Sequence, residues 1–171
     1  NEYEEIAFCS REFNLVKADK IKNSFKKPMV YLSVGRSVDL KDEIDVSNFN
    51  YDFIVTDGIN IKGHNVYYLP KETPNTQDYL MASDFVISKA GWGTVSEAML
   101  GKKKLALLSR DNVSEDRNTI KKLIDRDLAI EVDFDLEKIL KKLEEFTPRF
   151  DRYDFKNDYN KIGDIINGKE Q

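Results

Sequence analysis

Short apolar runs alternate with helical patterns along most of the chain. Six runs rich in branched and aromatic residues predict buried strands: 29–35, 53–56, 65–69, 85–88, 105–108 and 128–132. Apolar residues recur at helical spacing near 75–83, 94–101, 114–126, 135–146 and 157–167. Continuous apolar runs separated by helices are typical of a parallel sheet covered on both faces. The pattern therefore predicts an α/β fold, a Rossmann-like, doubly wound parallel sheet of about six strands.

The same pattern divides the chain and places a candidate site. Residues 28–146 carry the alternating elements and predict one domain. Residues 1–27 and 147–157 are polar and irregular, so we expect a linker or N-terminal arm (1–27) and a C-terminal arm and helix (147–171). Ligands of doubly wound sheets bind beyond the carboxyl ends of the strands. The site is therefore expected among the loops that contain Gly35, Gly58, Pro70, Gly91 and Arg110.

Composition narrows the classes of function. Of the 171 residues 34% are charged, the net charge is −4, and acids and bases are interspersed, which gives no electrostatic case for nucleic-acid binding. One cysteine and one histidine argue against a disulfide framework and an ordinary zinc site. No apolar run approaches membrane-spanning length and no secretory signal is evident, so a cytoplasmic location is expected. The histidine, His64, stands in a turn before a strand and receives no role.

The most unusual segment is the loop after the fourth predicted strand, SKAGWGT at 88–94. A strand followed by Gly-x-Gly and a helix start presents backbone N–H groups and a positive dipole end, which attract phosphate. Gly91 and Gly93 would let the backbone approach a diphosphate closely. A tight turn that needs glycine and binds no ligand is the competing interpretation, and a bare G-x-G does not decide between them.

Two other interpretations of this region stay open from the pattern alone. The TVSE of 94–97 matches the capping box, in which Thr94 and Glu97 would satisfy backbone N–H groups at a helix start. Gly91, Gly93 and Ser96 also imitate the G-x-G-x-x-G dinucleotide fingerprint, with Asp111 near the place of its acid. That fingerprint normally follows the first strand of the sheet. A nicotinamide or flavin enzyme is therefore the weaker alternative.

Three segments together resemble one known family. YLMASDFVISKAG (79–91) is similar to a family pattern LMAAADLVISRAG, and GTVSEA (93–98) with GK (101–102) is similar to GTxSEALALGKP. Glu115-Asp116 and the stretch 123–129 stand where the pattern continues as EQxxNAxxLxxxGxA. These patterns belong to the C-terminal domain of family 28 glycosyltransferases, which include the MurG-like N-acetylglucosaminyltransferases. The resemblance implies one half of a GT-B fold, a nucleotide-sugar-binding domain whose acceptor-binding partner is an N-terminal domain.

The resemblance also implies which residues meet the donor. In the family the glycine loop and the following helix meet the diphosphate and the sugar, and the glutamate at the position of Glu97 binds the ribose. A carboxylate accepting from two hydroxyls makes strong, charge-assisted hydrogen bonds, which favours this role over capping. The implied donor-binding residues are Gly35, Arg36, Ser37, Lys89, Ala90, Gly91, Trp92, Gly93, Thr94, Glu97, Glu115 and Asp116. The resemblance identifies no catalytic residue in this chain, and it implies no metal and no cofactor apart from the UDP-sugar substrate.

The chain departs from the family pattern at several positions. Its first loop reads Gly35-Arg36-Ser37 instead of Gly-Gly-Ser, and Arg36 either contacts phosphate or is a solvated loop residue. Glu115-Asp116 replaces the Glu-Gln pair that meets the donor sugar in relatives, which leaves the sugar preference open. Thr119 and Asp127 replace the usual Asn and Gly.

The function that the resemblance implies is the donor half of an inverting glycosyltransferase. It would transfer a hexosyl or N-acetylhexosaminyl group from a UDP-sugar to an acceptor hydroxyl. Activity then requires a missing N-terminal domain or a separate subunit, and peripheral membrane association would come only through that half. A UDP-sugar hydrolase domain and a non-catalytic nucleotide-sugar-binding module are the alternatives from other classes.

Overall fold

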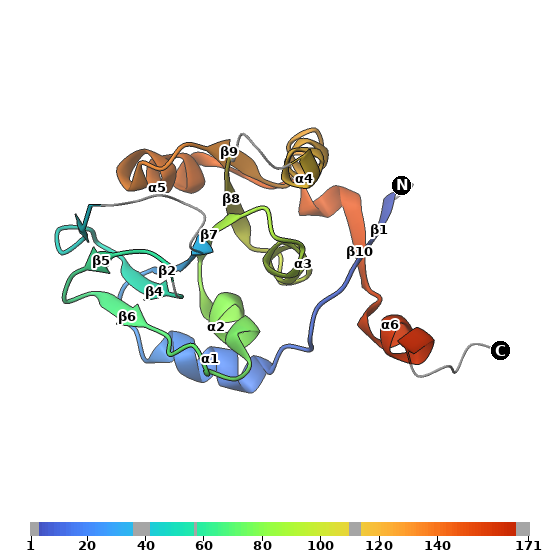
Figure 1. Cartoon of the computed structure of the whole chain (residues 1–171), viewed down its shortest axis with the longest axis horizontal. Helices are drawn as coiled ribbons and strands as arrows, with labels where there is room; N and C mark the ends of the chain where they lie inside the picture. The colour runs from blue at the N-terminus through green and yellow to red at the C-terminus, as the bar shows by residue number, and fades with distance from the viewer. Residues whose placement is uncertain (1–3, 36–41, 57, 110–113, 167–171) are drawn as a thin grey trace.

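The computed structural model describes residues 4–35, 42–56, 58–109 and 114–166, and a six-stranded parallel sheet lies at its centre (Figure 1). The strands are β2 Met29–Ser33, β4 Asp52–Val55, β6 Val66–Tyr68, β7 Phe85–Lys89, β8 Lys104–Leu108 and β9 Ile130–Val132. Their order across the sheet is β6-β4-β2-β7-β8-β9, with every neighbouring pair parallel. Along the chain this corresponds to the 3-2-1-4-5-6 order of Rossmann folds. The predicted fold class and its six strands are confirmed.

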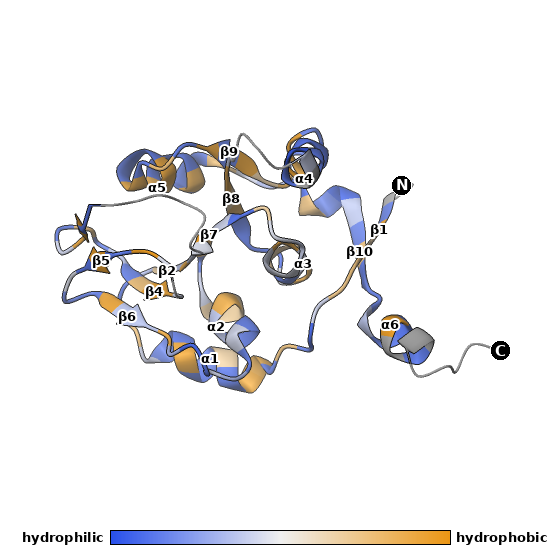
Figure 2. Cartoon of the chain, viewed as in Figure 1, coloured by the Kyte–Doolittle hydropathy of each residue, from blue (hydrophilic) through white to orange (hydrophobic). Residues whose placement is uncertain are grey.

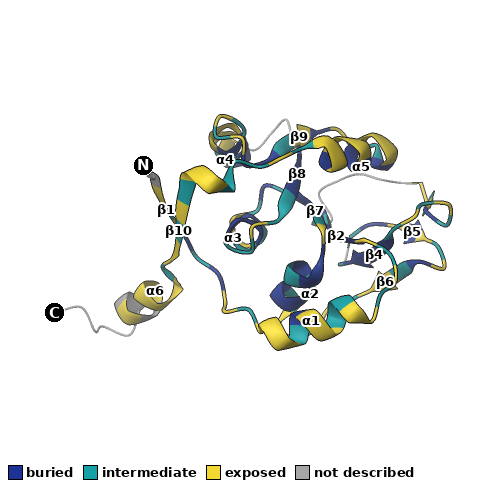
Figure 3. Ribbon diagram, turned by 180° about the vertical axis from the view of Figure 1, so that it is seen from behind, coloured by how far each residue is buried: buried dark blue, intermediate teal, exposed yellow. Residues whose placement is uncertain are grey.

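Helices and short strands cover both faces of the sheet (Figure 1). One apolar cluster joins the sheet to α1 Leu15–Asn23, α2 Thr76–Ala82, α3 Trp92–Leu100 and α4 Ser114–Ile124. The opposite cluster joins it to α5 Leu136–Glu145 and to a small pair, β3 Ile44–Asp45 and β5 Ile61–Lys62. The central strands are therefore buried on both sides, which explains why they appear in the sequence as unbroken apolar runs (Figures 2 and 3).

α5 shows how its pattern determines its packing. Leu136, Ile139, Leu140 and Leu143 are buried at helical spacing, while the lysines and glutamates between them face solvent. The Asp135 side chain caps the helix by accepting from the backbone N–H of Lys138 at 3.2 Å. Both signals are local, so the helix could be predicted within one residue of its observed ends.

The two ends of the described chain form a second, smaller sheet. β1 Glu4–Phe8 pairs in parallel with β10 Tyr153–Asn157, so that Ile6 lies opposite Phe155. The Asn157 amide extends the pair, because it accepts from the Ser10 N–H at 3.1 Å and donates to the Ser10 carbonyl at 2.8 Å. The prediction that these stretches are irregular is wrong. A pairing between strands this far apart in the chain leaves no local trace in either one.

α1 was missed for a different reason. Asn14 caps it by accepting from the Lys17 N–H at 3.0 Å, but only Ala18 of the helix is buried. A helix with so narrow an apolar contact has no clear stripe, and its many charges resemble those of a linker. The β1–β10 pair packs on the same apolar cluster through Phe8, Tyr153 and Phe155, whereas the described side chains of α6 Tyr159–Ile166 are exposed (Figure 3).

The end of α4 bears on the family resemblance. Asp127 has a left-handed backbone with φ 54°, and the Leu128 N–H reaches back to the Leu123 carbonyl at 2.9 Å. This is a helix ending in which glycine is the favoured residue. Asp127 stands where the family pattern has glycine. The backbone at this position therefore has the left-handed conformation that glycine favours, although the residue is aspartate.

Candidate functional site

A cavity of about 440 Å³ opens at the carboxyl end of the sheet. Ser33 and Gly35 line it from the end of β2, and Lys89 lines it from the end of β7. The first two turns of α3 form a further wall. β2 and β7 are the adjacent strands at which the chain order reverses, the position where doubly wound sheets bind ligands. Of the residues implied by the resemblance, the cavity brings together Gly35, Lys89, Gly93, Thr94 and Glu97.

The N-terminus of α3 forms one wall of this cavity. The helix begins at Trp92, Gly91 is its N-cap, and no side chain caps it. The interpretation of 94–97 as a capping box is therefore wrong, because Thr94 already lies in the first turn of α3 and Glu97 lies in the second. The first N–H groups of a helix have no partner within the helix. A Cβ added to Gly93 would meet no atom within 4 Å, so the backbone there is open to an approaching anion.

Lys89 brings a positive charge between the two loops. Gly35 has a left-handed backbone with φ 62°, and a Cβ built on it would lie 3.3 Å from Lys89 Nζ. The ammonium group thus lies against the loop after β2, although Lys89 itself ends β7. Together with the N-terminus of α3, it gives this part of the cavity a positive potential.

Glu97 supplies the negative group of the cavity. Its side chain is 12% exposed, and burial raises the pKa of its carboxyl, while the neighbouring Arg11 guanidinium lowers it. Arg11 Nη2 lies 3.5 Å from Glu97 Oε1 and donates to Thr76 Oγ1 at 3.3 Å. Sequence reasoning missed Arg11, because it belongs to a segment that has no pattern of its own. Long-range contacts bring this segment to the site: β1 pairs with β10, and the Gln77 amide donates to the Glu12 carbonyl at 3.0 Å.

Tyr31 and neighbouring residues complete the cavity. Burial, followed by the negative charge of Glu97, raises the pKa of Tyr31 to about 12, so its hydroxyl keeps its proton at neutral pH. Tyr31 also shares a side-chain hydrogen bond with Thr76. Leu69 and Pro70, after β6, add an apolar wall. The rest of the lining comes from the hydroxyl pair Thr56 and Ser33, 3.0 Å apart, and from Lys71.

Several other implied residues lie elsewhere. Ala90 is buried, Gly91 caps α3, and Asp116 is buried in α4. Trp92 is 51% exposed and lines a second cavity with Phe8, whose ring centroid is 5.7 Å away. His64 is exposed before β6, at the amino edge of the sheet and opposite the cavity. The positions that lie outside the described residues or side chains are Arg36, Ser37, Arg110, Asp111 and Glu115.

Comparison with solved structures identifies the fold. The glycosyltransferase VinC in complex with DTDP superposes with a TM-score of 0.58 at 14% identity, over 87% of this chain and 43% of that one. CalG4, the calicheamicin glycosyltransferase, gives 0.54 at 14% identity over 71% and 35%. The glycosyltransferase of kitacinnamycin gives 0.54 at 11% identity over 74% and 37%.

These structures show that the chain has the Rossmann-like fold of one half of a GT-B glycosyltransferase. The chain spans less than half the length of each of these three proteins. No family model and no curated protein matches its sequence. None of the helices in the described residues is long and apolar enough to cross a membrane.

Proposed function

We propose that this chain is the donor-binding half of a glycosyltransferase that uses a UDP-sugar. The observation that carries the proposal is the composition of the cavity at the strand switch point. There an open helix N-terminus at Gly93 and the Lys89 ammonium face the same space as the largely buried Glu97 carboxylate. A nucleoside diphosphate needs both a positive region for its phosphates and a hydrogen-bond acceptor for its ribose hydroxyls.

Each part of the donor has a matching part of the cavity. The diphosphate lies at the α3 N-terminus beside Lys89, where backbone N–H groups and the helix dipole favour negative charge. The ribose hydroxyls donate to Glu97. The base lies against the apolar wall of Leu69 and Pro70, and the buried Tyr31 also lines the cavity.

The proposed reaction is an inverting displacement. An acceptor hydroxyl oxygen attacks the anomeric carbon of the sugar. The bond between that carbon and the diphosphate oxygen breaks, and the hydroxyl proton of the acceptor passes to a base. The negative charge that develops on the leaving diphosphate is stabilised by the α3 N-terminus and Lys89. The only histidine is remote from the cavity, so we assign the base to a second domain or subunit that also holds the acceptor. We further propose that the transferred group is a hexosyl or N-acetylhexosaminyl group. Only the MurG-like sequence motif supports this choice of sugar.

Replacing Glu97 with glutamine is expected to weaken UDP binding by about 1.5–3 kcal/mol, because a charged hydrogen-bond acceptor for the ribose is lost. The fold should be unaffected, since the Glu97 side chain does not cap α3. Calorimetric titration with UDP and with 2′-deoxy-UDP measures the effect. Removing the 2′-hydroxyl should weaken binding to the unaltered chain and matter less to the variant. If removing the 2′-hydroxyl weakens binding equally in both proteins, Glu97 does not contact that hydroxyl.

Replacing Arg11 with methionine is expected to raise the pH at which donor binding fails. Glu97 accepts from ribose hydroxyls when ionised, so affinity falls as the pH drops through its pKa. Arg11 lowers that pKa, and its removal therefore moves the midpoint upward. Titration with UDP-glucose between pH 4 and 8 measures the midpoint, because this diester lacks the phosphate group that titrates near pH 6 in UDP. Replacing the exposed Arg152 with methionine is the control, and a midpoint shared by both variants would contradict the prediction.

A panel of UDP, dTDP, GDP, ADP and NAD tests the nucleotide class. We expect the pyrimidine diphosphates to bind most tightly. A preference for NAD would favour the dinucleotide-binding enzyme. Such enzymes have their glycine fingerprint in the loop after the first strand of the sheet, here β2, but that loop contains Gly35-Arg36-Ser37, which does not match the fingerprint. A hydrolase would release UDP from a UDP-sugar without any acceptor, and a non-catalytic module would bind the sugar nucleotide unchanged.

A further inference from the structure

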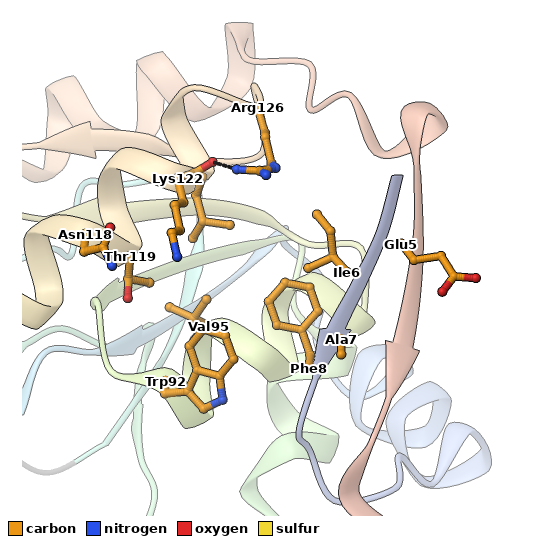
Figure 4. A pocket seen from close by; sticks show the side chains of 11 residues that line it. Glu5, Ile6, Ala7, Phe8, Trp92, Val95, Asn118, Thr119, Lys122 and Arg126 are labelled. Carbon is orange, nitrogen blue, oxygen red and sulfur yellow. Dashed lines mark hydrogen bonds between the residues drawn. The ribbon is translucent and has the colours of Figure 1, made fainter. Parts of the chain in front are cut away.

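A second cavity, of about 480 Å³, lies between β1, α3 and α4 (Figure 4). Trp92 and Val95 line it from the side of α3 that faces away from the donor cavity, which is lined by Gly93 and Glu97. α3 therefore stands between the two cavities. No part of the proposed donor site requires the second one.

The floor of this cavity is apolar. Val95, Leu123 and Phe8 are buried side chains that meet there from α3, α4 and β1. The Trp92 ring lies beside Phe8 but is half exposed, so one aromatic face borders the opening. An apolar hollow with an accessible aromatic wall favours a ligand that has an apolar body.

The rim of the cavity is positive. Lys122 is exposed on α4, and Figure 4 shows its side chain reaching into the space above Val95 and Trp92. Arg126 borders the same space and donates to the Lys122 carbonyl at 3.2 Å. The acidic lining residue, Glu5, points away from the cavity in Figure 4, and its carboxylate pairs with Lys156 at 2.5 Å.

We propose that this cavity binds a small organic anion with an apolar body, such as an alkyl phosphate, separately from the nucleotide. The apolar body lies against Val95, Leu123 and Phe8, where it is removed from water. The anionic group lies at the Lys122 ammonium, with the Asn118 amide and the Thr119 hydroxyl as further donors on the same helix. Because α3 stands between the cavities, both ligands fit at once.

Fluorescence of Trp92, the only tryptophan of the chain, tests the proposal. Octyl phosphate, kept below its micellar concentration, should shift the emission to shorter wavelength and saturate. Neutral 1-octanol should bind about fivefold more weakly, because it lacks the charge that Lys122 attracts. Saturating UDP should leave the octyl phosphate titration unchanged.

Two neighbouring lysine variants provide the matched comparison. Lys122→Met should weaken octyl phosphate binding about fivefold, to the level of octanol, and leave octanol binding unchanged. Lys121→Met removes the same charge one position earlier, where the side chain is 74% exposed and pairs with Asp125 at 3.6 Å, and should change neither titration. Both residues are exposed, and thermal melts verify that the variants fold.

The proposal is overturned by an unsaturable emission shift, by equal affinity for octyl phosphate and octanol, or by equal effects of the two lysine variants. Displacement of octyl phosphate by UDP would likewise overturn it, since the probe would then occupy the donor cavity. Failure of UDP to bind contradicts the proposed donor function alone, because the octyl phosphate titration is measured without UDP.

Discussion

Replacing Gly93 with valine is expected to abolish UDP binding and leave the fold intact. The backbone at Gly93 is the open part of the α3 N-terminus, because a Cβ there would meet no protein atom within 4 Å. A valine side chain therefore fits without strain but occupies the space where the diphosphate approaches the backbone. We expect a loss of about 100-fold or more in affinity, which corresponds to about 2.8 kcal/mol or more.

The open space makes this prediction a clean test. Valine has a higher helix propensity than glycine, so the melting temperature should stay the same or rise slightly. Gly93→Ala should give an intermediate affinity, because its single methyl group intrudes less. Calorimetry with UDP and a thermal melt of each variant measure both quantities. If Gly93→Val binds UDP as tightly as the unaltered chain at an unchanged melting temperature, the diphosphate does not lie at this helix.

The sheet could be predicted because its strands carry their signal locally. β8 Lys104–Leu108 is typical: four of its five residues are buried, since helices cover both faces of the sheet. Alternation with helices then limits the topology to parallel crossovers of one hand. Those rules identify the carboxyl edge of the sheet, where the candidate site lies, whereas the strand order and the switch point come from the structure.

The elements that the sequence does not reveal depend on distant partners or on small contacts. β1 and β10 form regular strands only because they pair with each other from opposite ends of the chain. α1 buries only Ala18, and polar contacts with distant residues, such as Lys17 Nζ with Asp78 Oδ2 at 3.3 Å, help to hold it. The start of α3 was misplaced at Thr94 because the capping-box pattern fits 94–97 by residue type, whereas the helix already begins at Trp92.

The candidate site divides in the same way. Lys89, Gly93 and Glu97 lie in one short segment around the start of α3, so a motif could identify them together. Tyr31 reaches the cavity from β2, and Arg11 reaches it from a segment that carries no motif. Trp92 stands within the motif, yet the helical rotation between adjacent residues turns it into the second cavity. Proximity in sequence thus identified the loop but not the direction of each side chain.

Incubated alone with labelled UDP-N-acetylglucosamine and candidate acceptors, the 171-residue chain is expected to bind donor and transfer no sugar. Among the described residues, the candidate site presents Lys89, Arg11 and the protonated Tyr31 around one carboxylate, Glu97, which the proposed ribose contact already occupies. Holding the acceptor beside the donor contributes up to about 7–11 kcal/mol in favourable intramolecular reactions, and an acceptor-binding half would supply that term together with the base. Adding that half, fused to the chain or as a separate subunit, should therefore restore turnover, and the same half combined with the Gly93→Val variant should not. Rapid transfer by the chain alone would place acceptor site and base within these residues and would refute the division of labour proposed for the two halves.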